Sequence, residues 1–184
     1  QVLRADQPPL YNDYRFRSNI SDARNIGLEA FGEVDILRLF GHKQAATRWT
    51  WFVNAAFVDA RYVNTDDTSV RNKKVEMAPP LMLRSGTSLH SGPWRAAFQA
   101  GYIATHYSDA TNAERSSTAV EGRIPAYLVA DISASYQWRL LRLEGSCNNL
   151  LDARYFTRRA ESYPGPGIIP SDGRGIYVTL GVRI

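Results

Sequence analysis

Apolar and polar side chains alternate with a period of two along most of this sequence, and this pattern limits the possible folds more than any other feature. From Ala126 to Tyr136 the even positions are apolar and most odd positions are polar, and Ile176 to Ile184 repeats the alternation. Successive side chains of a strand point to opposite faces, so this pattern is typical of strands with one apolar and one polar face. The sequence therefore predicts an all-β protein without a helix of useful length.

The alternating runs predict seven long strands and the end of an earlier one. Gly27 or Gly32 would tolerate a bulge that bends the first long strand, and the stretch from Val34 to Phe40 is locally ambiguous. Most of these strands exceed the roughly 9–11 residues that a tilted strand needs to cross a bilayer. The predicted strands cover roughly 14–38, 47–62, 75–90, 93–108, 124–138, 140–157 and 174–184, and a stub covers 1–5.

The connections between these strands alternate between short and long. Short ones fall near 41–46, 91–93 and 138–140, and long polar ones at about 63–74, 109–123 and 158–173. Outer-membrane barrels show this asymmetry, because their periplasmic turns are short and their extracellular loops are long. The four tryptophans all lie beside predicted short turns, as an aromatic girdle requires; they are Trp49, Trp51, Trp94 and Trp138.

Composition is compatible with a membrane barrel and argues against other classes. No window holds the roughly 18 consecutive apolar residues of a membrane-spanning helix. The formal charge is +4, but the basic residues are dispersed along the chain, which argues against a nucleic-acid partner. The 184 residues correspond to one domain, and they start at Gln1 without a signal peptide, so we interpret the chain as part of a longer protein.

Catalytic and metal-binding roles find little support in the sequence. His42, His90 and His106 are far apart, no known catalytic motif is present, and Cys147 is the only cysteine. Asp131 and Glu144 are expected to face the barrel interior on adjacent strands, where a polar network with Arg142 is favoured over a catalytic acid pair. We therefore predict a protein that is not an enzyme and binds no cofactor or metal of its own.

Several segments resemble TonB-dependent outer-membrane receptors. The run 148–156 (NNLLDARYF) is similar to the Asn-Leu-Phe-Asp-like motif of their penultimate strand, with Tyr155 three residues after Asp152. The segment 173–184 is similar to their last strand. Upstream, 25–29 resembles a Gly-Val-Glu element and 77–80 resembles the Ala-Pro start of another strand. These segments occur in the order and spacing of the family, so the resemblance covers almost the whole chain.

The resemblance implies an antiparallel transmembrane β-barrel of about 22 strands, of which 1–184 would be the C-terminal part. The plug domain and the TonB box would be absent from this chain. The implied function is transport of an iron chelate across the bacterial outer membrane, driven by the TonB complex through the missing N-terminal region. Outer-membrane lipid and lipopolysaccharide would surround the wall. The barrel-assembly machinery would recognise the last strand, which ends here in Ile184 where the family commonly has an aromatic residue.

The last long loop further resembles receptors for ferric citrate, a siderophore-type iron chelate. Arginine offers a planar fork of donors for carboxylates, and tyrosine offers a hydroxyl on an apolar ring. We expect the chelate to contact Arg158, Arg159 and Tyr163 first. The other candidates on the long loops and adjoining strand ends are Arg115, Arg123, Tyr107 and Arg174.

Two other classes of protein remain open at this point. One is a complete eight-stranded outer-membrane barrel with a structural or adhesive role, since eight strands suffice to close a barrel. The other is a soluble ligand-binding β protein, such as a lipocalin-like barrel, whose apolar faces would point inward. The receptor interpretation predicts that the expressed chain is insoluble without detergent, because its apolar stripes would otherwise face water.

Overall fold

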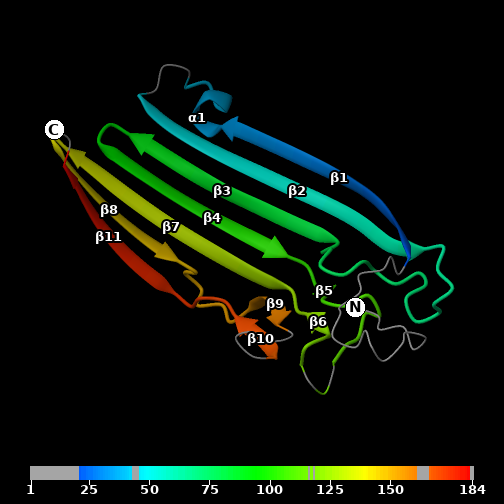
Figure 1. Ribbon diagram of the computed structural model, residues 1–184. Coiled ribbons are helices and arrows are strands. Elements are labelled where there is room, and N and C mark those ends of the chain that lie inside the picture. Colours follow the sequence, from blue (N-terminus) through cyan, green and yellow to red (C-terminus); the bar gives the residue numbers. More distant parts are fainter. Residues whose placement is uncertain (1–20, 43–45, 116, 118, 161–165, 183–184) are drawn as a thin grey trace.

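The computed structural model describes residues 21–42, 46–115, 117, 119–160 and 166–182. The chain alternates long strands with short elements that lie in the connections (Figure 1). The long strands are β1 (Asp22–Asp35), β2 (Thr47–Val63), β3 (Leu81–Ser91), β4 (Trp94–Ile103), β7 (Tyr127–Trp138), β8 (Leu141–Asn148) and β11 (Gly175–Val182). The short elements are the helix α1 (Ile36–Leu39) and the strands β5 (His106–Tyr107), β6 (Arg123–Ile124), β9 (Phe156–Ala160) and β10 (Gly167–Pro170). None of the helices in the described part of the chain is long and apolar enough to cross a membrane.

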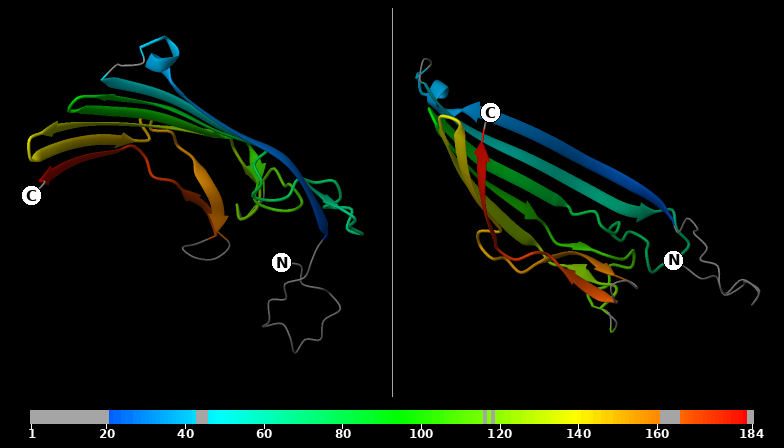
Figure 2. Two further views of the ribbon diagram at one scale, coloured as in Figure 1. Left: turned by 90° about the horizontal axis from the view of Figure 1, so that it is seen from above. Right: turned by 60° about the vertical axis from the view of Figure 1, so that its left-hand side comes forward.

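The seven long strands form one antiparallel sheet in the order β1-β2-β3-β4-β7-β8-β11. Every neighbouring pair keeps its register from end to end, so each side chain has a fixed face along the whole sheet. The sheet curves as one layer, with β1 and β11 at its two edges (Figure 2). This confirms the predicted antiparallel wall of seven full strands.

The register gathers the apolar alternation on the convex face of the sheet. Residues directly opposite each other in antiparallel strands lie on the same face, and pairs such as Ala96–Ala134 and Leu143–Leu180 continue the apolar rows from strand to strand. These side chains are not covered, since Leu28 is 67% exposed and Val178 is 74% exposed. An apolar face of this extent is typical of a sheet that contacts lipid.

The concave face carries the polar half of the alternation. Arg48, Thr50, Ser88, Arg95 and Ser135 lie on this face and line a hollow of about 550 Å³. A large membrane barrel has such a polar interior. A lipocalin-like soluble barrel would have the opposite arrangement, with apolar side chains inside, so the structure does not support that alternative.

The short turns and the long connections lie at opposite ends of the sheet (Figure 1). The tryptophans gather at the turn end, where Trp49 pairs with Leu89 and Trp138 with Leu141. The rings of Trp94 and Tyr136 are 4.5 Å apart between centroids. The turn end therefore carries a band of aromatic side chains on the convex face, as the sequence predicted.

The first predicted strand, 14–38, was wrong at its C-terminal end. Residues 36–39 form α1, which begins after Asp35 because the Asp35 carboxylate accepts a hydrogen bond from the Arg38 N–H over 3.2 Å. Gly27 and Gly32 cause no bulge, since β1 stays in register with β2 throughout. Residues 14–20 and the predicted stub 1–5 lie outside the described residues.

Later boundaries also differ from the sequence prediction: the strand expected at 93–108 ends at Ile103, and backbone chemistry explains three others. Residues 75–80 do not extend β3, because Pro79 and Pro80 have no N–H for the strand ladder. Pro125 likewise separates β6 from β7. The predicted strand 140–157 ends at Asn148, because Asn149 has a positive φ of 48° that a strand cannot accommodate.

Candidate functional site

The long connections gather at one end of the sheet, together with the hairpins β5–β6 and β9–β10 (Figure 1). Hydrogen bonds tie these connections to one another. The Met77 N–H donates to the Tyr107 carbonyl over 2.8 Å. The Asn112 side chain accepts from the Lys74 N–H and donates to the Lys74 carbonyl, each over 2.7 Å. The loop end is therefore a connected surface rather than a set of independent loops.

Two of the predicted ligand residues meet across the β5–β6 hairpin. Tyr107 pairs with Arg123 in register, and both contact Glu114. The Arg123 Nη1 lies 3.2 Å from Glu114 Oε2, and the Tyr107 hydroxyl donates to Glu114 Oε1 over 3.3 Å. Partial burial, followed by the Glu114 charge, raises the pKa of Tyr107 above its ordinary value. Tyr107 therefore stays a neutral hydroxyl, and Glu114 offsets part of the Arg123 charge.

Arg159 fastens β9 to the loop that precedes β6. Its Nη1 donates to the Ala119 carbonyl over 2.7 Å, and its Nη2 donates to the Arg123 carbonyl over 2.9 Å. The guanidinium also lies 5.1 Å from the centre of the Phe156 ring. Its enclosed Nε has no partner among the residues that the structure describes. Two of its donors thus bond to backbone carbonyls of the loop and of β6, and its contact with a ligand stays a prediction.

Arg158 is exposed and lines a hollow of about 480 Å³ between the loops. Hydrogen bonds from Ser69 lower the pKa of Asp67 in this hollow, so its carboxylate is ionised at neutral pH. A ligand in this hollow meets both cationic and anionic groups, since four carboxylates line it beside Arg158 and Arg159; they are Asp67, Glu76, Asp109 and Glu121.

The remaining predicted residues lie at different places. Arg115 is exposed, and its backbone bridges to Gly122 in the loop between β5 and β6. Arg174 lies just before β11, where its N–H donates to Asp152 over 3.1 Å. Tyr163 lies outside the described residues. The structure thus gathers five of the seven predicted residues around the two hairpins: Tyr107, Arg115, Arg123, Arg158 and Arg159.

Asn149 is a central residue of this end that the sequence analysis missed. It is 3% exposed and has a positive φ, which asparagine tolerates better than most residues. Its Oδ1 accepts from the Ala153 N–H over 2.8 Å, and its Nδ2 donates to the carbonyls of Ala153 (3.0 Å) and Asp172 (3.2 Å). Its own N–H donates to Asp131 of β7 over 2.9 Å. Asn149 therefore joins the wall to both arms of the β9–β10 loop.

Asp152 completes this junction. Its Oδ1 accepts from the Arg174 N–H, and its Oδ2 lies 3.2 Å from Arg154 Nη2. The Arg174 N–H, and then the Arg154 charge, lower the pKa of Asp152, so the carboxylate is ionised at physiological pH. The motif 148–156 thus forms a hydrogen-bonded junction between strand and loop, and its polar residues are the signal that the sequence analysis could have used.

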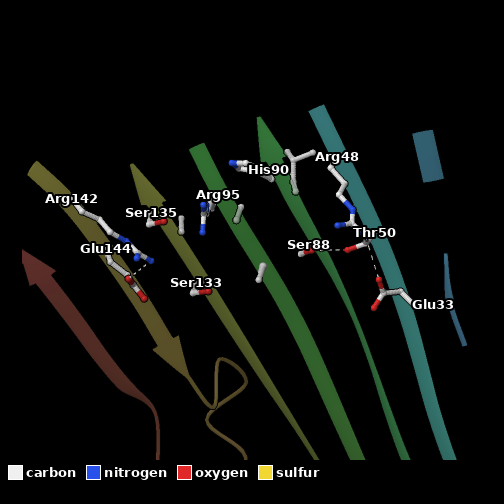
Figure 3. A pocket seen from close by; sticks show the side chains of 14 residues that line it. Glu33, Arg48, Thr50, Ser88, His90, Arg95, Ser133, Ser135, Arg142 and Glu144 are labelled. Atoms are coloured by element: carbon white, nitrogen blue, oxygen red, sulfur yellow. Dashed lines mark hydrogen bonds and ion pairs between the residues drawn. The ribbon is translucent and has the colours of Figure 1, made fainter. Parts of the chain in front are cut away.

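Charged groups also line the concave face near the short turns (Figure 3). Arg48 lies 3.7 Å from Glu33 and 3.5 Å from Asp35, across the β1–β2 pair. On β8, Arg142 Nη2 lies 2.8 Å from Glu144 Oε2. These pairs are partly exposed, so each contributes little to stability, on the order of 0–1 kcal/mol. Their main consequence is a charged, hydrophilic surface on the concave face of the sheet.

The expected network of Asp131, Arg142 and Glu144 was wrong in one member. Arg142 and Glu144 pair, but Asp131 accepts from Gln99 Nε2 over 3.1 Å and from the Asn149 N–H instead. Glu144 lies opposite Ser135 of β7, so Asp131 is four residues further along that strand, roughly 13 Å towards the loop end. Asp131 is therefore too far from Glu144 to join its ion pair, and it belongs to the junction around Asn149.

Within the described residues, no cluster of three or more His, Cys, Asp and Glu side chains is arranged to hold a metal ion. His90 lies in β3 at the turn end, and His106 lies in β5 at the loop end. The imidazole Nδ1 of His106 contacts the Ala104 carbonyl at 3.0 Å. The two histidines are thus at opposite ends of the wall, which agrees with the expectation that the histidines lie far apart.

Comparison with known proteins gives one family and a set of similar structures. A family model described as TonB dependent receptor-like, beta-barrel matches residues 1–150. The structure is similar to the ferric citrate transporter FecA in its unliganded form, with 20% identity and a TM-score of 0.74 over 87% of this chain and 24% of that chain. It is also similar to the ferric yersiniabactin uptake receptor FyuA from Yersinia pestis, with 18% identity and a TM-score of 0.67 over 87% of this chain and 23% of that one. No curated protein matches the sequence.

The siderophore receptor PiuA from Acinetobacter baumannii is a third similar structure, with 18% identity and a TM-score of 0.68 over 87% of this chain and 22% of that chain. At these identities the likeness concerns the fold, and the chain spans about a quarter of the length of each of these proteins. The family model covers most of the sequence, and the curved sheet with its two chemically distinct faces has the matching architecture. This chain therefore belongs to the TonB-dependent receptor-like β-barrel family.

Proposed function

We propose that this chain is part of the wall and the extracellular loops of an outer-membrane receptor that imports an iron chelate with energy from TonB. The observation that carries the proposal is the division of one sheet into an apolar convex face and a polar concave face, within a chain of this receptor family. A sheet with these faces separates lipid from a wet interior. The similar structures include receptors for ferric citrate and ferric yersiniabactin, which supports an iron chelate as the cargo.

In this proposal the loop end captures the chelate from outside the cell. Arg115 and Arg158 are exposed, and neither guanidinium forms an ion pair with a described residue, so both remain available to carboxylates of a chelate such as ferric citrate. Arg123 and Tyr107 add further donors at this end. One donor of each already contacts the Glu114 carboxylate. Arg174 and Tyr163 stay secondary candidates.

The same proposal assigns the surroundings of the chain. Lipid contacts the convex face between the aromatic band and the loop end, and lipopolysaccharide contacts the loop end. TonB acts through a region outside this chain, and the barrel-assembly machinery acts on the last strand. A complete eight-stranded barrel with an adhesive or structural role is the alternative. The match to about a quarter of much longer receptors favours the larger barrel.

The test is iron uptake by cells that carry or lack the full-length gene. We expect the deletion strain to lose import of radioactive iron from one chelate, with ferric citrate as the first probe and hydroxamate and catecholate chelates as the others. Import should also disappear in a strain without TonB. Uptake that is equal in the deletion and parent strains for all three chelate classes would contradict the proposal.

Single variants locate the capture site. R115A and R158A should each lower the affinity for the imported chelate by roughly tenfold, the value of a lost charge-assisted hydrogen bond of about 1.5 kcal/mol. R24A is the matched control, because Arg24 is an exposed arginine whose register places it on the convex face of β1. Affinity that falls equally in R24A would show that the effect is general charge and not a site.

A further inference from the structure

We propose that the concave face near the short turns holds a second anion site, which binds carboxylate groups of the chelate as it leaves the barrel. This turn-end arginine site consists of Arg95, Arg139 and Arg142 around a floor of Ser133 and Ser135. Figure 3 shows these residues except Arg139. The inference rests on the proposed transport function and extends it to the end of the wall opposite the loops. Its ligand class is an iron chelate with free carboxylate groups.

Two of these arginines stand on either side of β7. Arg95 of β4 lies directly opposite Ser135 of β7, and Arg142 of β8 lies directly opposite Gln137 of β7. Adjacent strands are about 4.8 Å apart and the two positions differ by two residues along β7, so the two arginine backbones are separated by roughly 12 Å. Ser135 and Gln137 of β7 lie between them, and the Gln137 carboxamide donates to the Arg139 carbonyl over 2.8 Å. A carboxylate above β7 is therefore within reach of guanidinium donors from both neighbouring strands.

The site has enough room for a chelate. Two adjoining hollows, of about 550 and 570 Å³, share His90, Arg95, Ser135 and Arg142. These volumes fall within the range of roughly 300–1,000 Å³ that is usual for small-molecule sites. Gly181 of β11 lies opposite Arg142 and adds no side chain, so the hollow stays open on this side.

The charge of this surface favours an anion. Three arginines and His90 line the second hollow, and none of its described lining residues is Asp or Glu. Arg142 has Glu144 as its partner, but Arg95 and Arg139 form no ion pair with any residue that the structure describes. Cationic groups that line a cleft without nearby counter-charges raise the local concentration of anions.

The hollow between the loops and the second hollow at the turn end therefore differ in charge. At the loop end, four carboxylates share the hollow with Arg158 and Arg159. At the turn end, the second hollow contains arginines without carboxylates. An anionic chelate that enters between the loops thus meets a hollow with a more positive lining at the far end, beside the first hollow, which Glu33 and Glu144 also line. Import moves the chelate in this direction.

The experiment uses the full-length receptor in cells and in purified form, with ferric citrate as the probe. R95Q/R139Q removes the two unpaired charges and leaves the Arg142–Glu144 pair intact, whereas R95K/R139K keeps both charges. R84Q is the matched control. Arg84 is also exposed, also faces the concave side and also forms no ion pair with a described residue, but it lies towards the loop end of β3 and outside the site.

We expect R95Q/R139Q to lower the maximal uptake rate by roughly tenfold, the lower end of what electrostatic focusing supplies. External binding affinity measured without energy, and the thermal midpoint of the purified receptor, should stay at the wild-type values. R95K/R139K should recover most of the rate, and R84Q should match the wild type.

The contrary outcomes separate this inference from the proposed function. If the receptor imports none of the three chelate classes, both fail. If it imports only chelates other than ferric citrate, the proposed function stands and the turn-end site fails. If the wild type imports ferric citrate and R95Q/R139Q does so at the same rate, only the turn-end site fails. Equal losses in the glutamine and lysine variants, or in R84Q, also overturn the site, because charge at this position is then not the cause. A lower thermal midpoint that accompanies the lower rate assigns the arginines to packing against another part of the receptor, and overturns it too.

Discussion

Single polar residues fix the loop end to the barrel wall through a few buried hydrogen bonds. Asn149 is the clearest case, since its side chain bonds to backbone groups on both arms of the β9–β10 loop. A buried group that loses its partner costs about 1–3 kcal/mol, so such a junction is stronger than its single bonds suggest. Asn148, its neighbour in the chain, is exposed and forms no side-chain hydrogen bond with a described residue.

The pair of asparagines allows a matched test of this junction. N149A should loosen the loop, because the Ala153 N–H and the carbonyls of Ala153 and Asp172 lose their partner, whereas N148A should have little effect. We expect trypsin to cleave the full-length receptor at Arg158 roughly tenfold faster in N149A, if cleavage follows local opening. N149G keeps the positive φ at low cost but lacks the carboxamide, so it should resemble N149A. Equal cleavage rates in N148A and N149A would contradict the role of the Asn149 side chain.

At the scale of strands, close packing between neighbours sets which residues the wall accepts. Gly86 of β3 is buried on the concave face between Phe52 of β2 and Gln99 of β4. A Cβ at this position would lie 2.7 Å from Phe52 Cε1 and 2.8 Å from the Phe98 carbonyl oxygen. Gly101 of β4 lies on the same face, and a Cβ there would meet nothing within 4 Å. The two glycines thus differ in the space around them and not in their strand environment.

This difference predicts unequal effects of one substitution. G86V should destabilise the barrel by about 1–3 kcal/mol, the usual cost of overpacking, because the ring of Phe52 and the backbone of β4 must both move. G101V should be near neutral, or stabilising through the β-propensity of valine. Thermal unfolding of the purified full-length receptor, followed by heat-dependent mobility on gels, measures both. Similar losses of stability in the two variants would contradict the packing argument.

For the whole molecule, the feature with the widest consequence is that few apolar side chains among the described residues of the sheet are buried, and most of these are alanines. The most exposed aliphatic side chains lie on the convex face, and the opposite face is polar and charged. Because no second layer covers the convex face in the described part of the chain, lipid is the medium that suits it. The edges β1 and β11 add unpaired backbone groups, which promote association in water.

The isolated chain, residues 1–184, should therefore be insoluble without detergent. After expression and lysis we expect it in the pellet of an ultracentrifugation, and in the supernatant only when detergent is present. The physical reason is the apolar convex face, which includes Ile176 at 74% exposure and Leu180 at 67%. A monodisperse soluble monomer in buffer alone would contradict both the lipid-facing sheet and the outer-membrane location.

The local patterns of the sequence determined the strands, their faces and the family. Period-two alternation predicted the seven long strands, and the spacing of Trp49, Trp94 and Trp138 predicted the aromatic band, because both depend only on neighbours along the chain. Strand ends were harder, since they depend on single residues such as Pro125 and the positive φ of Asn149.

Only the tertiary structure decided which side chains meet. It showed that Arg159 joins β9 to the loop that precedes β6, that Asp131 belongs to the Asn149 junction, and that Arg95 and Arg142 flank β7. These contacts join residues up to 40 positions apart in the chain, and the strand register that brings them together is set by the whole sheet. A period of two fixes the face of each residue but not its partner on the next strand, and for that reason the site residues required the fold.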